Sequence, residues 1–255
     1  MSDKGIIFSA PMIRALLDGR KTQTRRLLTN ARVFATPESR AFTLKKAELT
    51  RALQGADRWR HLGGTGWFWE SDAFDYQSPA TRTGWMAHLP YAPGDQLYVR
   101  ENFQLLSFGD YLPTKQRPAD VRFAATDPLA DLSPEDRGYP WRPCIHMPRW
   151  ASRMFLTVTD VRVQRLQEIS EDDARAEGLT PVLKSMPPLQ GCDGALRSRE
   201  VFEWEKGWSV NAVPAFEALW NSLHTAEGER WEDNPWIVAV SFDVHHGNID
   251  AEKAA

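Results

Sequence analysis

A short basic segment, Gly19–Arg26, gathers side chains that could do chemistry. Thr24 supplies a hydroxyl that could act as a nucleophile once a base removes its proton. Lys21 could be that base if its pKa falls, which burial or neighbouring cations achieve. Three nearby arginines supply such charge: Arg20, Arg25 and Arg26. A solvated basic surface is the alternative interpretation of the same run.

The residues around this segment predict a strand, a helix and a second strand. Ile6–Phe8 has the composition of a short strand, and Ser9 is a suitable N-cap for a helix that begins near Pro11. Gly19 is the expected end of that helix, because glycine adopts the left-handed conformation that follows a last turn. Residues 21–28 then form an extended segment.

Later stretches have their own local patterns. The turn Pro93-Gly94-Asp95 leads into an alternating strand over 96–100, and residues 154–163 form the strongest strand pattern of the chain. Residues 169–179 predict a short helix that Ser170 caps and Gly178 ends. An amphipathic helix over 216–223 and a closing strand over 236–244 follow.

Three loop-rich inserts separate these elements, at about 30–90, 104–140 and 181–213. Because the ordered segments are scattered between the inserts, we predict one domain over 1–247 and a loose polar tail over 248–255. The predicted fold class is α+β, a small β-barrel with short flanking helices, in which the first and last strands meet to close the barrel.

Composition narrows the range of functions. The net charge is −3, so contact with nucleic acid would need a local basic patch. The two cysteines have no CxxC partner, and no run of about 18 apolar residues or leader-like segment occurs. These observations favour a cytoplasmic protein without a membrane span. Some of the 11 tryptophans could be stacking platforms for bases, although most are expected to pack loops.

Several known catalytic motifs are absent from the sequence. The upstream helix excludes a phosphate-binding loop at Gly19–Thr22, and no Gly-x-Ser-x-Gly elbow occurs. Pro143-Cys144 lacks the second cysteine of a zinc deaminase. Cys144, His146 and Cys192 have a spacing that is weak evidence for a metal site. We therefore expect no metal and no cofactor.

Four separated stretches together resemble the ASCH family, a group of PUA-like β-barrels associated with RNA and modified nucleosides. They are residues 7–26, 93–101, 146–179 and 234–236 with the strand that follows. The insert-bearing, phage-associated subgroup looks most similar. The Gly-x-Lys-Thr-x-Thr-x-Arg run is specific only when it occurs together with the Gly-Asp turn strand.

The resemblance implies an activity. One branch of the family hydrolyses the amide of N4-acetylcytidine with a lysine, a threonine three residues later and a glutamate at the end of a later helix. Lys21, Thr24 and Glu177 stand at the matching positions of this chain. The small enzymes of that branch lack the three long inserts. We infer that the inserts wall the pocket and influence which acyl groups fit.

Five further residues are candidates to bind the substrate, a modified nucleoside or nucleobase: Arg20, Arg26, Trp69, Arg100 and Glu101. Alternatively, Glu177 is a surface carboxylate. Arg100 and Glu101 could likewise form only an ion pair at the end of a strand, which contributes little to the free energy of folding. The alternative function is a module that binds RNA or a modified base through Arg25 and Arg26 without turnover. Ribonuclease action is a third possibility, although no His pair on one element supports it.

Overall fold

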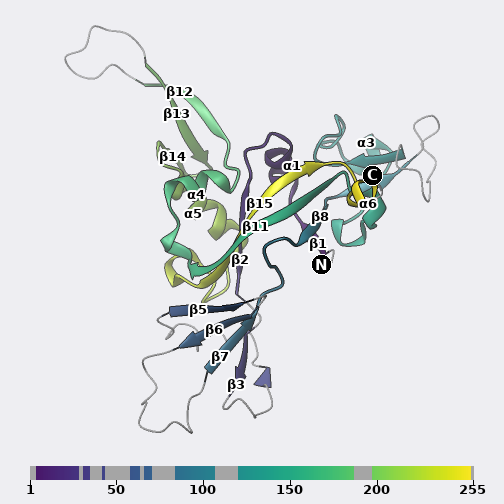
Figure 1. Cartoon of the computed structure of the whole chain (residues 1–255). Coiled ribbons are helices and arrows are strands. Elements are labelled where there is room, and N and C mark those ends of the chain that lie inside the picture. Colours follow the sequence, from purple (N-terminus) through teal and green to yellow (C-terminus); the bar gives the residue numbers. More distant parts are fainter. Residues whose placement is uncertain are drawn as a thin grey trace, which may run out of the picture. The chain divides into compact units, whose positions relative to one another are not determined.

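The computed structural model describes residues 4–28, 31–34, 42–43, 58–63, 66–70, 84–106, 120–186 and 197–253 (Figure 1). The chain divides into two compact units, each of which is considered by itself. The first unit consists of Met1–Thr22, Pro93–Thr159 and Ser241–Ala255, and the second of Gln23–Ala92 and Asp160–Val240. Strands with a few short helices form the structure, which confirms the predicted α+β class.

The first unit is built on three neighbouring strands. β1 (Lys4–Ile7) pairs in parallel with β8 (Gln96–Arg100), and β8 pairs antiparallel with β11 (Met154–Arg165). The strand predicted over 96–100 is confirmed, and the one predicted from residue 154 extends to Arg165. Leu97 and Val99 are buried at alternate positions of β8, as expected for a strand with one face in a core.

Helix α1 (Ala10–Leu17) begins and ends where the sequence predicts. Ser9 is its N-cap residue, although the Ser9 side chain accepts no capping hydrogen bond in the described structure. Gly19 has a φ of 70°, and the N–H groups of Gly19 and Arg20 donate to the carbonyls of Leu16 and Ala15. This pair of bonds is the Schellman arrangement, which reverses the chain directly before Lys21.

A five-stranded sheet has the order β1-β8-β11-β15-β2, where β2 is Gln23–Leu27 and β15 is Trp236–His246. β11 and β15 each continue from one unit into the other. Within the described residues the sheet is open, because β1 and β2 stand at opposite ends of its order. The last strand lies between β11 and β2 rather than beside β1, so the expected barrel closure is not present in this part of the chain.

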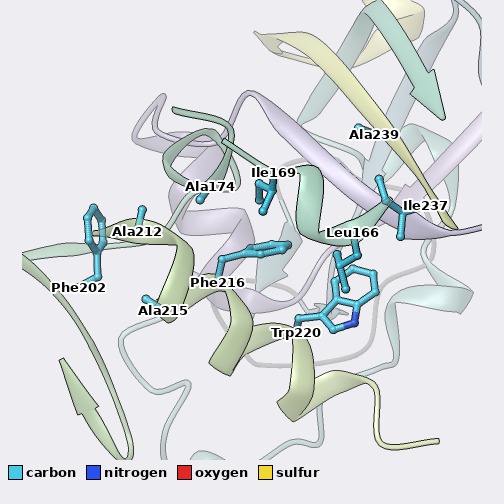
Figure 2. Packing of buried hydrophobic residues seen from close by; sticks show 10 residues of the cluster. All are labelled: Leu166, Ile169, Ala174, Phe202, Ala212, Ala215, Phe216, Trp220, Ile237 and Ala239. Atoms are coloured by element: carbon cyan, nitrogen blue, oxygen red, sulfur yellow. The ribbon is translucent and has the colours of Figure 1, made fainter. Parts of the chain in front are cut away.

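The core of the second unit lies beneath two helices, α4 (Glu171–Ala176) and α5 (Ala212–Leu223). Figure 2 shows Phe216 and Trp220 reaching from α5 toward Leu166. The cluster also contains Ile169, Ala174, Phe202, Ala212, Ala215, Ile237 and Ala239. The predicted amphipathic helix is thus confirmed in its central residues, whereas Leu223 at its end is exposed.

All three expected inserts contain paired strands in their described parts. Residues 30–90 include a second five-stranded sheet, in the order β4-β3-β7-β6-β5 (Figure 1). Its strands are β3 (Ala31–Phe34), β4 (Phe42–Thr43), β5 (Arg58–Gly63), β6 (Gly66–Glu70) and β7 (Gly84–His88). Residues 181–213 include an antiparallel three-stranded sheet of β12 (Pro181–Met186), β13 (Arg197–Trp204) and β14 (Gly207–Ser209). Cys192 lies outside the described residues.

The remaining insert contains β9 (Phe103–Leu105), which pairs antiparallel with β10 (Val121–Phe123), and α3 (Pro134–Arg137). Single 3₁₀ turns occur at Cys144–His146, Arg149–Ala151, Leu166–Glu168 and Trp231–Asp233. No helix within the described ranges has the length and apolar composition needed to cross a membrane.

The C-terminal residues, expected to be loose, instead form helix α6 (Ile249–Lys253). Ile249 is buried, and the Asn248 amide donates to the backbone carbonyls of Arg149, Trp150 and Ser152. These contacts anchor the chain end to the first unit, whereas residues 254–255 lie outside the described part.

Candidate active site

Lys21 is buried, with only 1% of its surface exposed. Its backbone N–H donates to the carbonyl of Ala15, so the end of α1 fixes where its side chain starts. Its Nζ lies 5.6 Å from the centre of the Phe8 ring. The solvated-surface interpretation of the basic segment is therefore wrong for this residue.

Thr24 is also buried, on β2. Thr22 and Arg26, at alternate positions on either side, are exposed. The face of β2 that carries Thr24 is therefore buried at Thr24 and exposed to solvent at Thr22 and Arg26.

Glu177 occupies the C-cap position of α4 and is 5% exposed. Ser170 caps the start of this helix by accepting from the N–H of Asp173, as predicted. Gly178 ends the helix, with a φ of 91°. Local capping determines both ends of α4 and therefore the position of Glu177 along the chain. Because Glu177 is buried, the alternative that it is a surface carboxylate is wrong.

Arg25 is the partner of Glu177 in the second unit. Its Nη1 donates to Glu177 Oε1 at 3.0 Å and to Gln23 Oε1 at 2.6 Å. Its Nη2 lies 3.1 Å from Asp173 Oδ2, and its guanidinium lies over the Phe216 ring at 5.8 Å. The Arg25 side chain is 0% exposed, so it does not form part of a solvated basic surface.

Asp173 connects this group of residues to the sheet. Its Oδ1 accepts from the Gln23 amide at 3.1 Å and from Arg162 Nη2 at 3.2 Å. Burial raises the pKa of the Asp173 carboxyl, but the Gln23 hydrogen bond and the charges of Arg25 and Arg162 outweigh it. The resulting pKa lies below its ordinary value.

Thr24 and Arg25 point to opposite faces of β2, because successive strand residues alternate. Arg25 and Leu27 face the cluster under α4 and α5. Thr24 and the Arg25–Glu177 pair therefore lie on different sides of one strand.

Glu101, at the end of β8, is 2% exposed and is bound by Arg153. Burial raises the pKa of the Glu101 carboxyl, and the hydrogen bond and charge of Arg153 oppose this rise. Arg100 is not its partner, so the predicted Arg100–Glu101 ion pair is replaced by Glu101–Arg153. The Arg100 side chain lies instead over Gly5, where a Cβ atom would stand 2.7 Å from Arg100 Cδ.

The other predicted binding residues occupy more open positions. Arg20 forms a 2.8 Å ion pair with Asp18, which is 57% exposed. Arg26 is exposed, and its charge lowers the pKa of Tyr91 against the larger opposite effect of burial. Trp69 lies on β6, in register with Trp59 and Trp85, and its side chain is outside the described structure.

Convergence of the candidate catalytic residues stays a prediction. Thr24 and Glu177 belong to the second unit, where they lie on different sides of β2, and Lys21 belongs to the first unit. Within the described ranges, no group of three or more His, Cys, Asp or Glu side chains is arranged to hold a metal ion. No family model matches the chain, and no curated protein or solved structure matches it.

Asp173 and Arg153 are site residues that the sequence did not identify. Asp173 lies four residues before Glu177, and this spacing puts both carboxylates on one face of a helix. The spacing could have indicated that they share a cation. For Arg153 no local pattern exists, because its partner Glu101 is 52 residues away.

Proposed function

We propose that this protein is a cytoplasmic amidohydrolase that removes the acyl group from N4-acylated cytosine nucleosides, with Lys21, Thr24 and Glu177 as catalytic residues. The observation that carries the proposal is that all three polar side chains are buried. Burying such groups costs free energy unless they form hydrogen bonds or ion pairs, so their burial without exposure to solvent favours a role in a site. The proposal also includes a PUA-like ASCH fold, which the strand–helix–strand opening and the turn strand β8 support.

In the proposed first step, Thr24 Oγ attacks the acyl carbonyl while Lys21 Nζ takes the hydroxyl proton. A lysine accepts this proton only when it is neutral, and burial favours the neutral amine.

In the next step the C–N4 bond breaks, and cytosine leaves as a neutral amine. Glu177 passes the proton from Lys21 to N4, so that no charge accumulates on the leaving group. Water then hydrolyses the acyl ester on Thr24 and releases a carboxylic acid. Arg26, exposed on the same face of β2 as Thr24, would hold a carbonyl or phosphate oxygen of the substrate.

The test is conversion of N4-acetylcytidine to cytidine, followed by chromatography. We expect Lys21→Met, Thr24→Val and Glu177→Gln each to lower kcat by about 10²–10⁴-fold, the usual contribution of a positioned acid or base. The matched control for Thr24 is Thr22→Val, which makes the same change at an exposed position of the same segment. Asp172→Asn, exposed on α4, is the control for Glu177.

The outcomes separate the candidate functions. Loss of turnover in the three variants but not in the controls supports the hydrolase. Absence of turnover with any N4-acyl cytosine, together with salt-sensitive RNA binding, would favour a binding module instead. Such a module could not use Arg25 as the contact that the sequence suggested, because that side chain is buried.

A further inference from the structure

Two arginines and two carboxylates form a connected group in the second unit. Arg25 contacts both Asp173 and Glu177, whereas Arg162 contacts Asp173. Gln23 completes the group by donating to Asp173 and accepting from Arg25. Arg162 also pairs with the exposed Asp160, so the group extends from the buried Arg25 to a third carboxylate at the surface.

Each of the two carboxylates contacts one arm of the Arg25 guanidinium. Asp173 receives Arg162, Gln23 and one arm of Arg25, and it is 18% exposed at its side chain. Glu177 receives the Nη1 of Arg25 and is 6% exposed at its side chain. Asp173 therefore contacts Nη2 of the Arg25 guanidinium, while Nη1 donates a hydrogen bond to Glu177.

We propose that Arg25 is a positioning residue for Glu177: it holds the Glu177 carboxylate in one orientation at the end of α4, and Asp173 fixes Arg25. This inference rests on the proposed hydrolase. A Glu177 carboxylate held in one direction is placed to accept the proton that Lys21 has taken from Thr24. A planar guanidinium holds a carboxylate in a fixed direction, which a flexible ammonium does not.

A purely structural ion pair would behave differently. Buried ion pairs are often replaced by well-packed apolar side chains without loss of stability. Arg25→Met retains apolar contact with Phe216, so a structural role predicts normal activity in a folded variant. A positioning role predicts a folded variant with impaired turnover.

The test compares kcat and KM for N4-acetylcytidine hydrolysis in the full chain. For Arg25→Met we expect kcat to fall about tenfold or more with KM nearly unchanged. Arg25→Lys should restore part of kcat. Arg175→Met is the matched control, because Arg175 also lies over an aromatic ring, that of Phe202, but is exposed on α4; it should leave both parameters within about twofold of wild type.

Each result decides the inference. Turnover lost in Glu177→Gln, with the kcat of Arg25→Met equal to wild type, overturns the positioning role alone. Absence of wild-type turnover overturns the proposed function and this inference with it. Should Arg25→Met fail to fold, Asp173→Asn replaces it. We then expect a severalfold lower kcat at unchanged KM, and an unchanged kcat overturns the inference.

Discussion

Arg153 binds Glu101 at two points: Nε lies 2.8 Å from Oε1, and Nη2 lies 2.9 Å from Oε2. The carboxylate is almost fully buried at the end of β8, and the guanidinium lies over the Phe123 ring at 4.1 Å. This ion pair joins residues 93–101 to residues 146–179, two segments of the proposed family resemblance, within the first unit. Its loss should therefore lower the free energy of unfolding.

Replacing Arg153 with methionine should lower the free energy of unfolding by about 2–3 kcal/mol, because it leaves a buried charge without its cation. The expected loss is below that of a fully buried pair, since the Arg153 side chain is 26% exposed. Urea unfolding at pH 7 measures it. The matched control is Arg149→Met, which removes a similarly exposed arginine from the more open carboxylate of Asp250. Equal losses in the two variants would contradict this prediction.

Asp173 should make stability depend on pH. Its pKa is lowered from 3.8 in the folded protein, despite burial, by Gln23, Arg25 and Arg162. A carboxyl with a lowered folded pKa contributes stability above its unfolded pKa and loses that contribution as the pH falls through its folded pKa. The stability difference between wild type and Asp173→Asn should therefore be constant near neutral pH and shrink below pH 3.8. Urea unfolding at several pH values measures it, and a difference independent of pH would refute the assignment.

Gly19→Ala should destabilise the protein by about 1–2 kcal/mol, the penalty of a left-handed backbone for a residue with a Cβ atom. Gly19 has a φ of 70°, and no atom lies within 4 Å of an added Cβ among the described residues, so the backbone alone is responsible. Gly19→Asn should lose less, because asparagine tolerates this conformation. Thermal unfolding of the two variants provides the comparison. Identical losses would indicate a steric cause instead.

Ile249→Ala should destabilise the protein by about 2–4 kcal/mol, the usual effect of removing a buried isoleucine. The exposed neighbour Asp250 offers a control, since Asp250→Ala should change the free energy of unfolding by about 1 kcal/mol or less. Urea unfolding measures both. A negligible effect of Ile249→Ala would mean that α6 contributes nothing to the first unit.

Helix and strand positions near the site could be predicted from the sequence because their causes are local. Ser170 and Gly178 delimit α4 through bonds to residues within a few positions, and Gly19 ends α1 in the same way. The alternation over 96–100 likewise depends on neighbouring residues only. Strand β3 was missed because its pairing with β7 joins residues far apart in the chain, such as Arg32 and Met86. The β5–β6 and β13–β14 pairs are local hairpins, so separation along the chain does not explain why they were missed.

The sequence by itself determined which chemical groups this protein has for catalysis, and where α1 and α4 place Lys21 and Glu177 along the chain. Only the tertiary structure decided that these groups are buried. It also decided that Arg25, which is 152 residues away, is the cation beside Glu177. The reason is physical: caps and turns are set by contacts a few residues apart, whereas burial and ion pairing depend on which distant segments fold against each other.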